Sequence, residues 1–218
     1  MTEFGAARAH MIESQLRPNK VTDARVLDTF GGIRRELFVP DHLRVVAYID
    51  EDLPLSGGRY LMEPMVVARL LQAAQIERTD KVLIIGAGTG YEAALAAALA
   101  RSVIALEEDP ELARRARAAL VEHFIASVSV VEGPLPQGYR PRAPYDVVLF
   151  CGAVADVPSE IDTQLAEGGR VLAVVKSANG IGRATLWART GGVMARRVLF
   201  DAATPLLPGF SPKPAFAF

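Results

Sequence analysis

The chain has 218 residues, a length typical of one α/β domain with an extension. Half of its residues are hydrophobic and 22% are charged, which argues against extensive disorder. The net charge of −1 provides no overall field to attract nucleic acid, and neither a membrane-spanning run nor a secretory signal is evident. We therefore expect a cytoplasmic protein that binds neither nucleic acid nor membranes.

The first eighty residues have the hydrophobic spacing of helices rather than strands. Apolar residues recur at helical intervals over 24–30 and 65–75. Between them, residues 50–58 combine acids with turn formers, which predicts either an ordered loop over a site or a solvated surface. We expect residues 1–80 to form a helical cap that packs on a core of residues 81–218.

From Lys81 onward, strand-like apolar runs alternate with helix-like segments, which is typical of a parallel sheet with crossover helices. The predicted strands are 81–87, 102–108, 127–132, 145–150 and 170–176, and the predicted helices are 91–101, 110–124 and 159–166. Asp109 and Pro110 suit the N-cap and first turn of the second helix, and Gly168-Gly169 is expected to end the third.

Two further segments complete the predicted fold. Four prolines exclude a strand from residues 133–144, so this segment is expected to be a loop at an edge where ligands tend to bind. Residues 184–189 and 195–200 flank Gly191-Gly192, which predicts a hairpin. The expected fold class is α/β, with a doubly wound, mostly parallel, Rossmann-like sheet and a C-terminal antiparallel hairpin.

A glycine-rich loop, Gly86-Ala87-Gly88-Thr89-Gly90, separates the first predicted strand from the first predicted helix of the core. Glycine at such a turn lets the backbone approach a ligand, and the helix N-terminus offers unpaired N–H groups. Glu107 ends the second strand about 20 residues further on and is followed by Glu108. A carboxylate there can accept hydrogen bonds from both ribose hydroxyls, so the combination predicts an adenosyl-binding site.

The residue after the loop argues against a dinucleotide cofactor. The nicotinamide and flavin fingerprint has a small residue at this position, whereas this chain has Tyr91. A G-x-G-x-G loop suits a nucleoside that carries an amino acid and no phosphates. A nicotinamide-linked oxidoreductase is therefore the weakest of the functional hypotheses.

No metal site is expected from the sequence. The three histidines, His10, His42 and His123, are scattered without the spacing of metal ligands. The single cysteine, Cys151, follows an apolar strand-like run and is expected to be buried and inert. It cannot form an intrachain disulfide.

Short blocks spread over most of the chain follow one another in a specific order. They are Gln15-Leu16, Val26-Leu27, 35–40, Ala47-Tyr48, 85–91, 144–146, Val157-Pro158, Gln164-Leu165 and 168–170. In these blocks the chain resembles the protein-L-isoaspartate O-methyltransferase family, as a divergent bacterial member. The resemblance implies S-adenosylmethionine as methyl donor, S-adenosylhomocysteine as product, and isoaspartyl or D-aspartyl carboxyl groups of damaged proteins as acceptors.

One departure from the family concerns the acceptor. Where the family has Thr-x-Ser-x-Pro beside the transferred methyl group, this chain has Tyr60-Leu61-Met62-Glu63-Pro64. Met62 cannot donate a hydrogen bond to a substrate carboxylate, and an inward-pointing Glu63 would repel one. The Tyr60 ring can face the sulfonium. Tyr60, Met62 and Glu63 are therefore the predicted acceptor wall.

A second departure concerns the adenine. Where the family has Gly-Asp-Gly, this chain has Gly133-Pro134-Leu135. Pro134 offers neither a carboxylate nor a backbone N–H, whereas Leu135 keeps its N–H. The predicted cofactor-binding residues are Gly86, Ala87, Gly88, Thr89, Gly90, Glu107, Glu108, Gly133, Pro134 and Leu135.

Three hypotheses follow from a cofactor scaffold that is retained and an acceptor wall that is changed. The leading one is a carboxyl methyltransferase acting on isoaspartyl residues. Such an acceptor is already ionised at neutral pH, so the lack of a histidine base is no objection. The alternatives are a methyltransferase with a different acceptor and a non-catalytic adenosyl-binding module.

Overall fold

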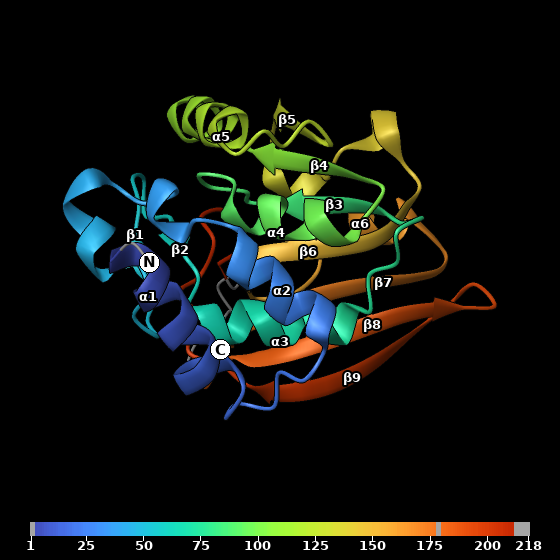
Figure 1. The fold of residues 1–218 in the computed structure, drawn as a ribbon. Coiled ribbons are helices and arrows are strands. Elements are labelled where there is room, and N and C mark those ends of the chain that lie inside the picture. Colours follow the sequence, from blue (N-terminus) through green and yellow to red (C-terminus); the bar gives the residue numbers. More distant parts are fainter. Residues whose placement is uncertain (1–2, 178–179, 212–218) are drawn as a thin grey trace, which may run out of the picture.

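The computed structural model of the chain describes residues 3–177 and 180–211. Within these residues, a seven-stranded sheet has the strand order β5-β4-β3-β6-β7-β8-β9 (Figure 1). The strands are β3 (Lys81–Ile85), β4 (Ser102–Glu107), β5 (Val128–Glu132), β6 (Tyr145–Val154), β7 (Leu165–Val175), β8 (Arg183–Thr190) and β9 (Val193–Asp201). The first five pair in parallel, and β8 and β9 are antiparallel. The predicted α/β class with its C-terminal hairpin is confirmed.

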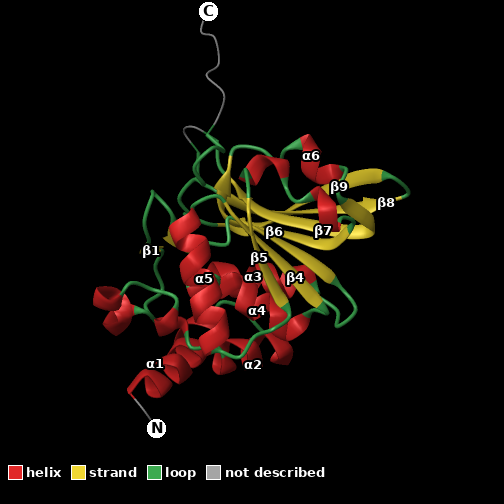
Figure 2. Ribbon diagram, turned by 90° about the horizontal axis from the view of Figure 1, so that it is seen from above, coloured by secondary structure: helices red, strands yellow, loops and turns green. Residues whose placement is uncertain are grey.

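Both faces of the sheet are covered. The helices are α1 (Glu3–Met11), extended by a π-helical turn (Ile12–Leu16), α2 (Ala24–Gly32), α3 (Pro64–Ala74), α4 (Tyr91–Leu99), α5 (Pro110–Glu122) and α6 (Ser159–Asp162). Val82 and Ile84 of β3 pack in one hydrophobic cluster with α1 to α4, whereas Leu83 and Ile85 pack in a second cluster with α6. Figure 2 shows α1 to α4 on one side of the sheet and α6 on the other. Burial on both faces explains why β3 is a continuous apolar run.

The predicted start of α5 is confirmed. The Asp109 side chain accepts hydrogen bonds from the N–H groups of Glu111 and Leu112 at 2.8 and 3.2 Å, and Pro110 occupies the first turn. No helix in the described ranges is long and apolar enough to cross a bilayer.

The predicted helix over 159–166 is wrong beyond Asp162. Leu165 instead begins β7 and pairs with Tyr145 of β6. The register then shifts, so Gly168-Gly169 lie in an irregular part of the strand and not at a helix end. Leu165 is buried, and a buried leucine fits the helical period as well as it fits a strand. The sequence pattern therefore does not separate the two structures.

The first eighty residues also contain a small hairpin that the sequence pattern does not indicate. Strands β1 (Leu53–Pro54) and β2 (Tyr60–Leu61) pair, and β1 lies within the segment 50–58 that was expected to be a loop. Two residues are too few to display the strand period. Helices α1 to α3 share a hydrophobic cluster with the sheet, and the boundary between cap and core at residue 80 stays a prediction. The end of the predicted core, 212–218, lies outside the described residues.

Candidate active site

The glycine loop joins β3 to α4 at the carboxyl edge of the sheet. Gly86, Gly88 and Gly90 have φ angles of +77°, +56° and +95°, a region that disfavours side chains. The N–H groups of Gly86 and Ala87 both donate to the carbonyl of Leu106 at 3.0 Å, which holds the loop against the end of β4. The conformation of the loop therefore depends on its three glycines.

Close packing fixes the second half of the loop. A Cβ on Gly90 would lie 3.1 Å from the Cβ of Ala116, so this glycine allows α5 to pack against the loop. The buried Thr89 hydroxyl donates to the carbonyl of Phe38, which joins the loop to the N-terminal segment. The Tyr91 ring packs against the same Phe38, with 5.5 Å between ring centroids. The N-terminal segment thus accommodates the bulky residue that follows the loop.

Glu107 lies beside the loop and is completely buried. Its Oε2 accepts a hydrogen bond of 2.6 Å from the N–H of Gly88, and its Oε1 accepts from the N–H groups of Glu108 and Asp109 at 2.9 and 3.0 Å. Oε1 also accepts from Nη1 of Arg59 at 2.7 Å, in an ion pair whose side chains are both buried. A hydrogen bond therefore joins the glycine loop directly to Glu107 at the end of β4. Their spacing in the sequence predicts that the two lie together.

These contacts limit what Glu107 can still bind. A carboxylate offers about four lone-pair positions, and here three donors converge on Oε1 whereas one reaches Oε2. Oε2 can therefore accept one more hydrogen bond. If both ribose hydroxyls are to bind, as the sequence predicts, Oε1 must release a donor, and Arg59 is the side-chain donor among the three.

A pocket of about 320 Å³ opens next to Glu107. It is lined by Gly57, Arg59, Glu107, Glu108, Asp109, Pro110, Leu135 and Pro208. Small-molecule sites usually measure about 300–1,000 Å³, so the pocket suits part of a nucleoside ligand. Of the residues predicted to bind the cofactor, Glu107, Glu108 and Leu135 line this pocket, and the glycine loop lies directly behind Glu107.

The segment that replaces Gly-Asp-Gly is divided between two surfaces. The Leu135 N–H points toward the Glu108 carboxylate, 3.5 Å from its Oε2. Gly133 and Pro134 line a separate hollow together with Tyr139. The structure therefore brings Leu135 to the pocket but not the two residues before it.

Sequence reasoning missed two residues that cover the glycine loop, Arg59 and Leu207. The N–H of Leu207 donates to the carbonyl of Ala153 at 2.8 Å, which lays the C-terminal segment along the end of β6. A Cβ on Gly86 would lie 3.0 Å from Cδ2 of Leu207 and 2.7 Å from Nη2 of Arg59, so both side chains cover this glycine. The Gly57-Gly58 turn is the sequence signal that the chain beside Arg59 can pack closely against another segment. No sequence signal marks Leu207.

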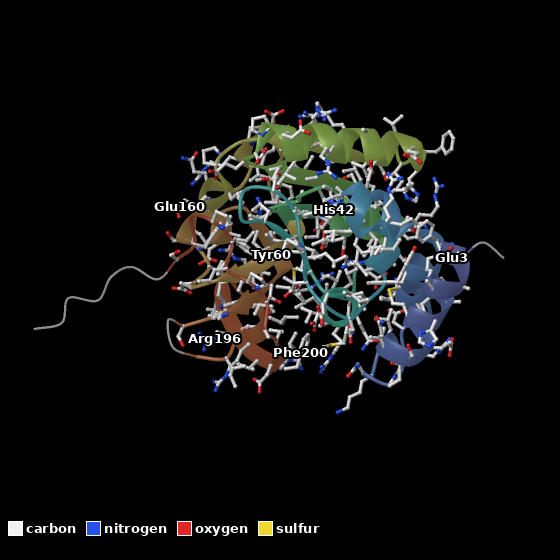
Figure 3. All side chains as sticks on the ribbon, turned by 90° about the vertical axis from the view of Figure 1, so that its left-hand side faces the viewer. Glu3, His42, Tyr60, Glu160, Arg196 and Phe200 are labelled. Carbon is white, nitrogen blue, oxygen red and sulfur yellow. The ribbon has the colours of Figure 1, made fainter. Side chains whose placement is uncertain are left out.

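The residues of the predicted acceptor wall do not share one surface. Met62 is 1% exposed and packs in the core, while its carbonyl accepts a hydrogen bond from Nη2 of Arg35 at 2.9 Å. Tyr60 is 39% exposed and lies on the hairpin, near the middle of the face in Figure 3. Glu63 is half-buried, and its N–H donates to Oδ1 of Asp52 at 2.9 Å. The Met62 side chain therefore lies in the core, whereas Tyr60 and Glu63 keep part of their surface exposed, and their role as an acceptor wall stays a prediction.

Acidic groups surround Glu63. Burial raises the pKa of Glu63 to about 7, and the charges of Asp50, Asp52 and Glu51 add to this shift. Burial likewise raises the pKa of Glu92, on α4, to about 7. Near neutral pH, both carboxyl groups therefore exchange between protonated and ionised forms.

Cys151 is a free cysteine in β6, and its expected burial is confirmed. Burial raises the pKa of its thiol well above the ordinary value, as expected of an inert cysteine. In residues 3–177 and 180–211, no three His, Cys, Asp or Glu side chains are arranged to hold a metal ion. The expectation that the protein uses no metal stays a prediction.

Comparisons with known sequences assign the chain to a family. The model of the protein-L-isoaspartate(D-aspartate) O-methyltransferase family matches residues 6–198. A protein-L-isoaspartate O-methyltransferase of Koribacter versatilis is 44% identical over 177 residues, which are 81% of this chain and 80% of that protein. Its counterpart from Methanoculleus marisnigri is 41% identical over 168 residues, which are 77% of this chain and 76% of that protein.

Solved structures share the fold at lower identity. A protein-L-isoaspartate O-methyltransferase superimposes with a TM-score of 0.81 at 24% identity, over 94% of this chain and 67% of its own. A Plasmodium falciparum protein provisionally given this name, solved in complex with S-adenosyl-L-homocysteine, has a TM-score of 0.79 at 15% identity, over 95% and 99% of the two chains. The family match and the two relatives show that the chain belongs to the protein-L-isoaspartate(D-aspartate) O-methyltransferase family.

Proposed function

We propose that the protein transfers a methyl group from S-adenosylmethionine to the carboxyl group of isoaspartyl residues in damaged proteins and releases S-adenosylhomocysteine. The observation that carries the proposal is the buried Glu107 carboxylate, which is bonded to Gly88 of the glycine loop and borders the 320 Å³ pocket. Membership of the family points to the reaction, and this carboxylate offers a place for the ribose.

The residues of the pocket fit an adenosyl group. Oε2 of Glu107 accepts one hydrogen bond in the structure and can accept a second from a ribose hydroxyl, and Leu135 and Pro208 line the pocket with apolar side chains for the adenine. The Glu108 carboxylate borders the same pocket and can accept from the adenine amino group. Glu108 would then take the role that Pro134 cannot fill.

S-adenosylmethionine supplies an electrophilic methyl group on a sulfonium, so the protein must align the acceptor and exclude water. Leu55 and Leu207 contribute to this exclusion, because they cover Gly88 and Gly86 of the loop. A carboxylate acceptor has a reference pKa of about 4 and is ionised at neutral pH. The transfer therefore needs no general base.

Glu63 gives the proposed acceptor site a pH dependence, because its pKa is about 7. The protonated carboxyl group has an O–H that can donate to the acceptor carboxylate, as the hydroxyl groups of the family motif can. The ionised form, surrounded by Asp50, Glu51 and Asp52, repels that acceptor instead. Because a raised pKa keeps Glu63 protonated up to about pH 7, transfer is favoured below this pH and disfavoured above it.

We expect kcat/KM for an isoaspartyl peptide to fall about fivefold between pH 7 and pH 8 as Glu63 loses its proton. The E63Q variant keeps an N–H donor without the charge, so its kcat/KM should stay level over the same range. The exposed glutamate Glu77 provides a matched control, and E77Q should retain the wild-type profile. A level wild-type profile, or an E63Q profile that still falls, would show that Glu63 does not face the acceptor.

Transfer to an aged protein tests the proposal as a whole. We expect labelled methyl groups from S-adenosylmethionine to appear as base-labile esters on a protein preparation rich in isoaspartyl residues. A fresh preparation of the same protein is the control and should take up much less label. Equal labelling of both preparations, or no labelling of either, would contradict the proposed acceptor.

The proposed partners are accordingly isoaspartyl-containing proteins and peptides. The near-neutral charge of the chain supports a substrate other than nucleic acid, and membrane association is not part of the proposal. We also propose a cytoplasmic location, on the basis of the composition of the chain.

A further inference from the structure

Arg59 combines a buried charge with hydrogen-bond donors that have no acceptor. The residue is 5% exposed, and Nη1 donates to Oε1 of Glu107 at 2.7 Å. Its Nε and Nη2 are buried, and neither donates to any acceptor among the residues that the structure describes. Burying guanidinium N–H groups without acceptors is unfavourable, so this edge of Arg59 calls for a ligand.

Glu107 does not account for the position of Arg59. The carboxylate already accepts hydrogen bonds from the backbone N–H groups of Gly88, Glu108 and Asp109. These donors come from the same sheet edge and would remain if Arg59 were removed. The ion pair therefore provides an acceptor for Nη1 of the guanidinium and provides none for Nε and Nη2.

The free edge lies at the glycine loop. Nη2 would be only 2.7 Å from a Cβ on Gly86, so the guanidinium lies directly against a backbone that carries no side chain. Arg59 also lines the pocket beside Glu107. A group attached to a ribose at Glu107 is therefore within reach of the same guanidinium.

The chemistry of this edge identifies the ligand group. Nε and Nη2 of an arginine form a planar fork that matches the two oxygens of a carboxylate. Both reactants of the proposed reaction carry one, since S-adenosylmethionine has an amino-acid carboxylate and the isoaspartyl acceptor has its own. The polar atoms of the fork are buried, which strengthens a charge-assisted bond.

We propose that the Nε–Nη2 edge of Arg59 binds a ligand carboxylate, while Nη1 stays on Glu107 until a ribose hydroxyl replaces it. The inference rests on the proposed function, because it takes the ligand from the two reactants. Arg59 is then a ligand-binding residue in the hairpin between β1 and β2, at a position outside both the glycine loop and the predicted acceptor wall.

Calorimetric binding of two ligands tests the cofactor as the source. S-adenosylhomocysteine carries the carboxylate, and its decarboxylated analogue, which keeps the amine, does not. We expect the wild type to bind S-adenosylhomocysteine about 10- to 100-fold tighter than the analogue, as a bidentate charge-assisted pair provides. R59Q should bring this ratio close to one, and R59K should retain part of it as a point charge.

A matched control separates this effect from a general loss of arginine charge. Arg114 is exposed and pairs with Glu111 on α5, and R114Q should leave the ratio unchanged. Thermal unfolding of each variant shows whether it is folded. If R59Q does not fold, the ratio measured for R59K decides the question.

Kinetics distinguish the second source. If R59Q keeps the wild-type ratio but raises KM for an isoaspartyl peptide tenfold or more at unchanged kcat, the bound carboxylate is that of the acceptor. If neither the ratio nor KM changes, or if R59Q binds S-adenosylhomocysteine more tightly, Arg59 is structural or obstructs the site, and the inference is overturned. A wild type that binds the cofactor but transfers no methyl group would overturn the proposed function alone, whereas a wild type that binds no S-adenosylhomocysteine would overturn both.

Discussion

The E107Q variant should lose about 3–5 kcal/mol of unfolding free energy, because it leaves a buried guanidinium without its counter-ion. Glu107 is completely buried and is bonded to Arg59, Gly88, Glu108 and Asp109. Glutamine replaces one acceptor oxygen with an NH₂ group, which must face an N–H donor. Urea unfolding measures the loss, and binding of S-adenosylhomocysteine should weaken by about 1–3 kcal/mol in addition.

Two comparisons test the cause of this loss. E108Q changes the exposed neighbour of Glu107 and should alter stability by less than about 0.5 kcal/mol. In the E107Q background, R59Q removes the unpaired buried charge, so the double variant should recover part of the lost stability. Equal losses in E107Q and E108Q, or a double variant less stable than E107Q, would show that the Arg59–Glu107 pair does not govern stability here.

G88V should abolish measurable binding of S-adenosylhomocysteine. Gly88 has a φ of +56°, which a β-branched residue adopts only at a cost of about 1–3 kcal/mol. A Cβ at this position would also lie 3.1 Å from Cδ1 of Leu55, and the displaced loop would withdraw its N–H from Glu107. Calorimetric titration measures the loss of binding.

The hairpin turn between β8 and β9 offers a control with the same backbone strain. Gly191 has a φ of +61°, and a Cβ there would meet nothing within 4 Å. G191V should therefore lose stability like G88V but keep its affinity for S-adenosylhomocysteine. Wild-type affinity in G88V would place the cofactor away from the glycine loop.

Local rules made part of the candidate site predictable. Adjacent parallel strands end at the same edge of a sheet, so the spacing between the glycine loop and Glu107 indicates that they meet there. They do meet, through the Gly88 N–H. Asp109 and Pro110 likewise mark the start of α5, because capping depends on residues within one turn.

Long-range packing decided what the sequence pattern could not indicate. Arg59 meets Glu107 across 48 positions, and Leu207 reaches Gly86 only because its segment pairs with the end of β6. The place of Met62 in the motif predicts a residue of the acceptor wall, but its apolar side chain is buried in the core. Burial is common for methionine, and the motif alone does not reveal it. Gly168-Gly169 resemble a helix end and instead lie in an irregular strand, since the pairing partner is remote in sequence.

The most direct test of the proposed function is methyl transfer to two synthetic peptides. One carries an isoaspartyl residue, and the other carries an aspartyl residue at the same position. The peptides have the same composition and charge, so a difference between them reports recognition of the isoaspartyl carboxyl group alone. Transfer from labelled S-adenosylmethionine to the isoaspartyl peptide only is the expected result, and it would show that the reaction of the family tolerates Met62 and Glu63. Tight binding of S-adenosylhomocysteine with transfer to neither peptide would contradict the proposed acceptor.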